Sequence, residues 1–375
     1  MDFAFDADQE EFRRSLRRFL TDKAGSAVVR AAASTDTGVD PGLWRQLAEH
    51  IGLPALHVPE EYGGAGASLL EAAIAMEELG RALTPVPYAT GLFATQAILL
   101  LGSEAQKKEL LPDIAAGEAV AALAISEPGV ATGPTGVTLR ATPRGADAVL
   151  TGTKSHVLHG HVADLLLVAA IDSDGSSPDD VGLFVVRTAD GRVRVTRQDT
   201  FDLTRPVATL ELDGVTATRL GAGEPGAAGF ADVLDAARAL LACEMVGGTE
   251  RCLEMAVAYA KNREQFSRPI GSFQAVKHKC ADMVVALDGA RAAAYYAAMV
   301  AAQGGPELRT VAPLAKAEAG EAFAFAAGEN IQVHGGIGFT WEHDAHLYFR
   351  RAKTDQLLFG STAENRALLA DRIGL

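Results

Sequence analysis

The apolar residues of this chain follow a helical period at both ends and a strand period in the middle. Near the start, Phe12, Leu16 and Phe19 recur at the spacing of one helix face. Between about residues 119 and 225 the period changes to two, as in residues 192–197 and 209–213, where polar and apolar side chains alternate. This middle region has no helix-length segments between its strands, which argues against a doubly wound parallel sheet.

Helical spacing returns after the middle region. Cys280, Met283 and Leu287 lie on an apolar seam suited to packing in a helical bundle. Residues 304–306 (Gly-Gly-Pro) break the chain before another helix, which we expect from about residue 313 to residue 330. The predicted order is therefore helical over residues 1–118, β over residues 119–225 and helical over residues 226–375.

The composition excludes several classes of partner. The 34 Lys and Arg residues against 48 Asp and Glu residues give a formal net charge of −14, the wrong sign for a nucleic-acid-binding surface. No stretch approaches the ~18–20 apolar residues that span a bilayer, so we expect no membrane insertion. The start MDFAFDADQEEF lacks the basic and apolar parts of a signal peptide. The three cysteines form no ligand-like pairs, and a reducing cytoplasm fits them best.

A Ser-Glu-Pro-Gly segment at residues 126–129 has the residue types of a ligand-binding turn. Pro128 fixes φ and Gly129 permits a tight turn, so Ser126 could present its hydroxyl group and neighbouring amides to a planar ligand. A plain surface turn accounts for the same residues, and the segment alone does not decide between the two.

Two further segments suit phosphate recognition. Residues 263–274 connect two expected helices and hold two arginines, two phenylalanines and Gln274; a solvated helix end would explain the charges but not the aromatic side chains. In residues 332–339, Gly335 and Gly336 either let backbone amides approach a phosphate or only cap the preceding helix. His343 and His346 have no obvious third ligand, so we expect no metal and interpret that segment as the start of a helix.

In combination and in this order, these segments resemble the acyl-CoA dehydrogenase family of flavoproteins over nearly the whole chain. The resemblance also includes residues 52–54, 62–64 and 102–112. It implies an α+β multidomain fold with an N-terminal helical domain, a middle β-barrel or sandwich domain and a C-terminal four-helix bundle. It implies FAD as the cofactor, an acyl-CoA substrate, an electron-transfer acceptor, and assembly as a homotetramer or as a heterotetramer with a related subunit.

The same resemblance implies where the ligands bind. The expected FAD-binding residues are Leu123, Ile125, Ser126, His156, Val157, Leu158, Arg263, Phe266, Phe273, Gln274, Gln332, Val333, Gly335, Gly336, Gly360 and Thr362. Of these, Arg263, Gln274 and residues 332–336 match positions that reach the FAD of a neighbouring subunit. The expected substrate-binding residues are Thr132, Asp235, Arg238 and Phe359. In the family, a carboxylate removes the α-proton of the acyl thioester while the β-hydrogen leaves as hydride to the flavin.

The sequence departs from the family pattern at the catalytic base. Phe359 stands where the usual glutamate precedes a glycine, and Ala237 stands at the alternative glutamate position before Arg238. Neither side chain can accept a proton, so we assign no catalytic base. Glu244 lies on nearly the same helix face as Ala237 but roughly 10 Å further along the axis, and we interpret it as part of a buried ion pair.

The flavin site departs from the pattern as well. Family members place Trp-Ile-Thr where this chain has His156, Val157 and Leu158, and Leu158 cannot donate a hydrogen bond to the flavin ring. The backbone amide of Phe359 can still donate to a thioester carbonyl, because that contact needs no side chain. Three functions remain open: an acyl-CoA dehydrogenase whose base is supplied elsewhere, a base-less subunit of a heteromeric complex acting on fatty or sterol-derived acyl-CoA, and a flavin monooxygenase on the same fold.

Overall fold

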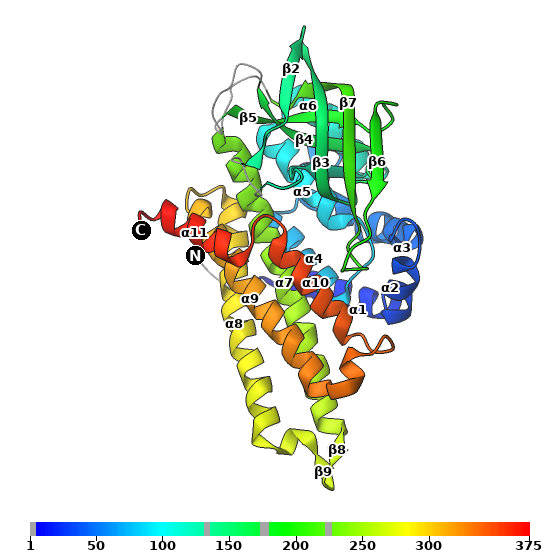
Figure 1. The fold of residues 1–375 in the computed structure, drawn as a ribbon, viewed down its shortest axis with the longest axis vertical. Helices are drawn as coiled ribbons and strands as arrows, with labels where there is room; N and C mark the ends of the chain where they lie inside the picture. The colour runs from blue at the N-terminus through cyan, green and yellow to red at the C-terminus, as the bar shows by residue number, and fades with distance from the viewer. Residues whose placement is uncertain (1–4, 131–135, 173–179, 222–226) are drawn as a thin grey trace.

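Helices form both ends of the chain and a β-barrel lies between them in the sequence (Figure 1). The computed structural model describes residues 5–130, 136–172, 180–221 and 227–375. The order helical, β, helical confirms the expected fold class. Thr132, one of the expected substrate-binding residues, lies outside the described residues.

Four of the N-terminal helices, α1, α3, α4 and α6, begin at capping side chains. Ser68 and Glu71 form a capping box at the start of α4, and Ser103 and Gln106 form one at the start of α6. These reciprocal hydrogen bonds satisfy backbone donors that a helix leaves free at its first turn. The elements are α1 (Ala7–Lys23), α2 (Ser26–Ala33), α3 (Pro41–Gln46), α4 (Leu69–Ala82), α5 (Tyr88–Leu101) and α6 (Glu104–Ala115), with the short helical turns η1 (Leu47–Ile51), η2 (Leu53–Ala55) and η3 (Glu60–Tyr62).

The middle region closes into a barrel. Its strands are β1 (Ala121–Ala124), β2 (Arg140–Arg144), β3 (Asp147–Leu158), β4 (Leu165–Asp172), β5 (Val181–Arg187), β6 (Val193–Arg197) and β7 (Val207–Arg219). The pairing runs β4-β2-β3-β7-β5 and returns from β5 to β4, while β1 pairs with β4 and β6 pairs with β7. β1 and β2 run parallel to β4, and the other pairs are antiparallel. Closure leaves few unpaired strand edges.

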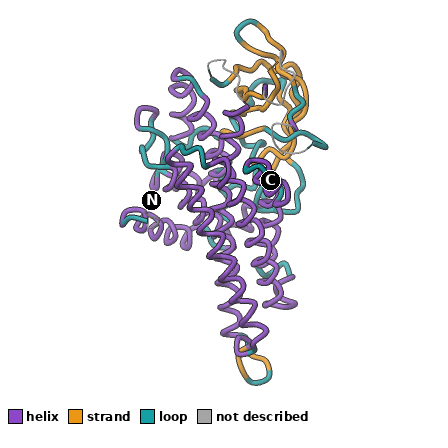
Figure 2. Tube along the Cα trace, turned by 90° about the vertical axis from the view of Figure 1, so that its left-hand side faces the viewer, coloured by secondary structure: helices purple, strands orange, loops and turns teal. Residues whose placement is uncertain are grey.

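Long helices make up the C-terminal region. They are α7 (Ala227–Asn262), α8 (Gln274–Gln303), α9 (Leu308–His334), α10 (Ala345–Leu357) and α11 (Thr362–Arg372), with a hairpin of β8 (Glu264–Gln265) and β9 (Arg268–Pro269) and the turns η6 (Ile270–Ser272) and η7 (Gly335–Phe339). Gly304 ends α8 with a left-handed φ of 67°, as the Gly-Gly-Pro segment predicts. Figure 1 and Figure 2 show the β8–β9 hairpin at one end of the long helices and the barrel at the other end.

The apolar side chains form two cores. One belongs to the helices, and it joins Met76 of α4, Leu240 of α7 and Phe323 of α9 in a single cluster. The other fills the barrel. β4 is buried on both faces, because Leu166 belongs to the barrel core and Leu167 belongs to the helical core. The barrel therefore rests on the helices, and a cavity forms at this contact.

The apolar content of α8 corrects one expectation. Within the described residues, α8 is the one helix that could cross a membrane by length and composition, although we expect no such stretch. Half of its apolar window is buried inside the protein, and Met283 and Leu287 belong to the helical core. Core helices of a bundle have the same apolar character, so packing against α7 and α9 accounts for this composition.

Candidate functional site

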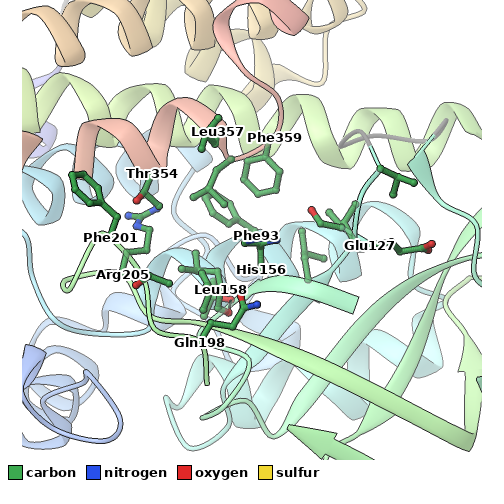
Figure 3. Close-up of a pocket in the computed structure, with 18 of the residues that line it drawn as sticks. Phe93, Glu127, His156, Leu158, Gln198, Phe201, Arg205, Thr354, Leu357 and Phe359 are labelled. Carbon is green, nitrogen blue, oxygen red and sulfur yellow. Dashed lines mark hydrogen bonds between the residues drawn. The ribbon is translucent and has the colours of Figure 1, made fainter. Parts of the chain in front are cut away.

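A cavity of about 580 Å³ lies where the barrel meets the helices. This volume is in the range of small-molecule and cofactor sites, roughly 300–1,000 Å³. Figure 3 shows Phe359 reaching from the turn after α10 toward Phe93 of α5, with His156 and Leu158 of β3 on the barrel side. The other lining residues are Thr90, Leu123, Ile125, Ser126, Glu127, Gly129, Val130, Gln198, Asp199, Thr200, Phe201, Arg205, Val207, Thr354, Leu357, Leu358 and Glu364.

The barrel wall of the cavity is built by the end of β1 and an irregularity in β3. The register of β3 against β7 shifts between Lys154 and Val157, and His156 takes a left-handed φ of 53°. His156 and Leu158 line the cavity, whereas Val157 between them is buried in the barrel core. The amide nitrogen of Ser155 donates to the carbonyl oxygen of Ser126 at 2.8 Å, and this hydrogen bond ties the two segments together.

A buried ion pair supports the turn after β1. Lys154 Nζ lies 2.6 Å from Glu127 Oε1 and donates to the carbonyl oxygen of Ile125 at 3.1 Å. Burial lowers the pKa of the Lys154 ammonium group, and the neighbouring carboxylate opposes this shift. Thr138 and the amide nitrogen of Leu139 also donate to Glu127. Glu127 lines the cavity, but its carboxylate is occupied by these structural contacts.

The turn between α10 and α11 carries Phe359. Phe359 and Gly360 both take left-handed backbone conformations, with φ of 56° and 99°. The ring of Phe359 meets Phe93 edge-on with the centroids 5.0 Å apart. Its carbonyl oxygen accepts a hydrogen bond from Arg238 Nε at 3.0 Å, and Arg238 Nη1 lies 2.7 Å from Asp235 Oδ1. The structure therefore brings three of the expected substrate-binding residues together.

The carboxylates that line the cavity, within the described residues, are Glu127, Asp199 and Glu364. Glu364 accepts a hydrogen bond from the amide nitrogen of Ser361 at 2.7 Å in the capping box of α11, and this contact lowers the pKa of the Glu364 carboxyl. Asp199 is exposed. Ala237, at the alternative base position, is buried on α7. Among the described residues that line the cavity, therefore, no carboxylate is both buried and unpaired.

Five charged side chains form a buried cluster beside the cavity, where the barrel, α7 and α10 meet. This junction cluster consists of Asp202, Arg205, Glu244, Arg351 and Asp355. Arg351 lies 2.8 Å from Glu244 and 3.0 Å from Asp202, and Arg205 contacts Glu244 and lies 3.3 Å from Asp355. The predicted ion pair of Glu244 is confirmed. Burial raises the pKa of Asp355 to about 7.

The remaining expected FAD-binding residues lie elsewhere. Gly360 and Thr362 belong to the turn and to the start of α11, close to the cavity. Arg263 and Phe266 are exposed at the β8–β9 hairpin, where the ring of Phe266 lies edge-on to Phe273 with centroids 6.0 Å apart. Figure 1 places this hairpin at the opposite end of the long helices from the barrel.

Residues 332–336 join the hairpin at that far end. His334, at the end of α9, lies against Tyr259 of α7 with ring centroids 4.3 Å apart, and the amide nitrogen of Arg263 donates to the carbonyl oxygen of Tyr259 at 2.8 Å. The hairpin and the glycine-rich turn therefore form one group of residues. This group does not reach the cavity of its own chain.

His343 lies just before α10 and His346 lies in its first turn, and both pack as part of a helix start. His343 stacks near His334 with ring centroids 4.3 Å apart, and its Nδ1 accepts from the amide nitrogen of Ala345 at 3.1 Å. His346 lies edge-on to Trp341. In the portion of the chain that the structure describes, no three His, Cys, Asp or Glu side chains are grouped to hold a metal ion.

Several residues at the site escape short-range sequence reasoning. Phe93, Gln198 and Arg205 belong to no motif, and only the packing of α5 and of the segment before β7 brings them to the cavity. The sequence did contain a signal for Lys316 of α9, which contacts the turn at Phe359. It lies on the apolar stripe formed by alanines at positions 312, 315 and 319, where a lysine needs a specific partner.

Comparisons with known proteins agree with this geometry. The family model for the acyl-CoA dehydrogenase N-terminal domain matches residues 6–118, and the model for the acyl-CoA dehydrogenase C-terminal domain matches residues 226–374. Among curated proteins, acyl-CoA dehydrogenase IpdE2 of Mycobacterium tuberculosis is 36% identical over 362 residues, which cover 95% of this chain and 94% of that protein.

Two solved structures share the complete fold. A variant of the Tcur3481–Tcur3483 steroid acyl-CoA dehydrogenase superposes with a TM-score of 0.89 at 32% identity, covering 98% of each chain. The ChsE4–ChsE5 complex from Mycobacterium tuberculosis superposes with a TM-score of 0.89 at 28% identity, covering 100% of this chain and 99% of that chain.

Proposed function

Because the chain belongs to the acyl-CoA dehydrogenase family, we propose that its cavity is one part of an FAD site for the α,β-dehydrogenation of an acyl-CoA thioester. As a flavoprotein of this family, it is an FAD-dependent acyl-CoA dehydrogenase-like oxidoreductase. We further propose that it works as the base-less subunit of a heteromeric complex. The absence of a buried, unpaired carboxylate among the described cavity residues is the observation that carries this second step.

The lining of the cavity fits the ring system of a flavin. Apolar side chains from the helices and the barrel face it, and the turn at Ser126 and the left-handed residue His156 supply polar groups at the barrel wall. When bound there, FAD supplies the acceptor for the hydride that leaves the β-carbon of the acyl group. Ser126 would orient the ring, and His156 and Leu158 would cover one of its faces.

The nucleotide part of FAD requires residues that this cavity lacks. Arg205 is the cation among the described lining residues, and its guanidinium group is held by Glu244 and Asp355. Arg263 and Gln274 are exposed at the opposite end of the bundle, beside the glycine-rich turn. We propose that these residues of one chain complete the FAD site of its neighbour, as the matching family positions do. Arginine suits the pyrophosphate, because its guanidinium group can form two parallel hydrogen bonds.

The acyl thioester would lie against the turn at Phe359. The amide nitrogen of Phe359 would donate to the thioester carbonyl, and such a donor stabilises charge that develops on the oxygen. Proton removal would fall to the partner chain in its own cavity. The relatives named as a steroid enzyme and as a two-component complex support a partner of the same family and a bulky, steroid-derived acyl-CoA.

Flavin stoichiometry tests this assignment. The chain is purified alone and after co-expression with related chains encoded beside it, and the FAD-to-chain ratio and the bleaching of flavin by acyl-CoA are measured. We expect little flavin in the chain alone, and a fixed ratio together with bleaching in the complex. Full flavin content and acyl-CoA oxidation by the chain alone would contradict the base-less subunit. Rapid reoxidation by oxygen with a hydroxylated product would instead indicate a monooxygenase.

Introducing a carboxylate at position 359 tests the missing base directly. In the complex, Phe359→Glu should raise the rate of flavin bleaching at this chain's own cavity by on the order of 10²-fold, the lower end of general-base contributions. Phe359→Gln is the matched control, because glutamine has the same size and the same backbone strain but accepts no proton at neutral pH. Equal rates in the two variants would show that a base is not what this cavity lacks.

A further inference from the structure

Three buried polar side chains from three helices hold the turn that carries Phe359. Arg238 of α7 donates from Nε to the carbonyl oxygen of Phe359 at 3.0 Å. Lys316 of α9 donates from Nζ to the carbonyl oxygen of Gly360 at 3.3 Å. Asn365 of α11 donates from Nδ2 to the same carbonyl oxygen at 2.8 Å. We call Arg238, Lys316 and Asn365 the turn clamp.

Lys316 is the least expected member of the turn clamp. Its side chain is 1% exposed, and within the described residues no carboxylate lies within ion-pair distance of its ammonium group. Burial lowers its pKa to about 7, so the charged form is costly at this position. Its contacts are the carbonyl oxygen of Gly360 in the turn and, at 3.4 Å, the carbonyl oxygen of Gln356 at the end of α10. An apolar side chain would fill the space without this cost, but it would remove one of the two donors to the Gly360 carbonyl oxygen and the donor to the Gln356 carbonyl oxygen.

The turn clamp leaves the amide nitrogen of Phe359 unused. The clamp engages the carbonyl oxygens of Phe359 and Gly360, and the amide nitrogen of Gly360 donates to the carbonyl oxygen of Leu357 at 3.3 Å. The amide nitrogen of Phe359 has no acceptor among the described residues, although Phe359 is only 8% exposed. A buried amide without a partner is uncommon, and because Phe359 lines the cavity, a water or a ligand there would supply the acceptor.

The backbone of Phe359 explains why a clamp is needed. A left-handed conformation costs a residue with a side chain roughly 1–2 kcal/mol, and Phe359 takes this conformation directly before Gly360, which as a glycine adopts a positive φ at little cost. Without external hydrogen bonds the turn would relax toward an extended conformation, and the amide nitrogen would change direction.

We infer that the turn clamp positions the amide nitrogen of Phe359 as the hydrogen-bond donor for the carbonyl oxygen of an acyl thioester, with Lys316 as a positioning residue. Lys316 itself does not line the cavity and acts only through the turn. This assignment rests on the proposed function for the class of ligand. The role of the turn clamp does not depend on a catalytic base. The chain would therefore still recognise the thioester although it lacks a base that abstracts a proton.

A pair of ligands that differ only at the carbonyl group tests the turn clamp. One is a saturated acyl-CoA thioester, and the other is the alkyl-CoA thioether in which a methylene replaces the carbonyl. The binding of each ligand to the full chain is measured by calorimetry, and the flavin content is measured on the same sample. If the chain is soluble only in the complex, the complex is used. We expect the wild type to bind the thioester about tenfold more tightly, the effect of one hydrogen bond. Lys316→Met should remove most of this preference while the thioether affinity stays unchanged.

The ratio of the two affinities separates a loss of positioning from general damage to the fold, because a loss of packing weakens the binding of both ligands alike. Lys353→Met is the matched control, since Lys353 is exposed on α10 and its ammonium group contacts Gln356 Oε1 at 3.3 Å and the ring of Phe349 at 5.4 Å from the centroid, away from the turn. If the Lys316→Met variant does not fold, Asn365→Leu is tested in its place. This substitution removes the hydrogen bonds that α11 donates to the turn, and the ratio of thioester to thioether affinity is measured as before. A wild type without preference, or clamp variants that keep it, would overturn the inference. Low flavin content with an intact preference would count against the proposed cofactor site alone.

Discussion

At the scale of single residues, Asp355 sets the charge balance of the junction cluster. Two guanidinium groups, of Arg205 and Arg351, face three carboxylates, and Asp355 is fully buried without a hydrogen bond to either oxygen within the described residues. Burial is the main cause of its raised pKa, which lies at about 7, and the neighbouring guanidinium groups only partly oppose it. The folded protein therefore keeps a proton on Asp355 over a range where the unfolded chain has lost it.

This difference predicts a pH dependence of stability. Between about pH 4 and pH 7 the folded state binds one proton more than the unfolded state at Asp355, so its contribution to the free energy of unfolding falls as pH rises. Relative to Asp355→Asn, the wild type should lose stability over this window, by on the order of a few kcal/mol at most. Lys316, whose lowered pKa is also about 7, acts in the opposite direction and only above that pH.

Urea unfolding at pH 4.5, 6 and 7.5 measures the effect. Asp113→Asn, at an exposed position of α6, is the control and should track the wild type at each pH. A difference between wild type and Asp355→Asn that is the same at all three pH values would mean that Asp355 does not hold the extra proton.

At the scale of elements, the contact between α4 and α7 depends on two glycines. A Cβ at Gly247 would lie 1.8 Å from the carbonyl oxygen of Glu77, and a Cβ at Gly80 would lie 2.3 Å from the carbonyl oxygen of Glu244. Each helix thus brings its backbone against a glycine of the other. This close approach joins the N-terminal helices to the bundle in one core and fixes where Glu244 enters the junction cluster.

Gly247→Ala should therefore separate α4 from α7. We expect a loss of about 3 kcal/mol, because the clash is with backbone atoms that cannot rotate away. Gly328→Ala on α9 is the matched control, since a Cβ at this position would have no atom within 4 Å and alanine favours a helix by up to about 1 kcal/mol. Thermal unfolding distinguishes the two: equal transition temperatures for both variants would mean that the helices adjust freely.

At the scale of the whole molecule, the proposed ligand-binding residues form two groups at opposite ends. The cavity residues lie where the barrel meets the helices, while Arg263, Phe266 and the glycine-rich turn lie at the far end of the bundle (Figure 1). A dinucleotide held by both groups needs two chains. This arrangement makes the proposed flavin site a property of the assembly.

Arg263→Ala tests this proposal in the complex. If Arg263 binds the pyrophosphate across the interface, its loss should weaken FAD binding on the order of 10- to 100-fold, since hydrogen bonds to charged groups contribute about 1.5–3 kcal/mol. Arg14→Ala is the control, because Arg14 is an exposed arginine of α1 paired with Glu11. Flavin content after dialysis is the measurement. Unchanged content in Arg263→Ala would rule out this role for the hairpin.

Much of the fold follows from local pattern. The alternation in residues 192–197 predicts β6 and that in residues 209–213 predicts part of β7, because side-chain period reflects which faces an element buries. The expectation that no stretch approaches the apolar length of a membrane span was wrong for α8. Apolar content alone does not distinguish a core helix from a membrane-spanning one. Barrel closure through β4 and β5 has no local signal, because it depends on pairing between strands that are distant in the chain.

The amino-acid sequence by itself determined the order of helical and β regions, the family, and the presence of phenylalanine at position 359. Only the tertiary structure decided that Lys316, Arg238 and Asn365 converge on one turn, that Asp355 is buried beside two arginines, and that the two groups of proposed ligand-binding residues lie apart. The reason is physical: local sequence specifies which face of a helix or strand is apolar, whereas the meeting of distant polar side chains is set by how those faces pack.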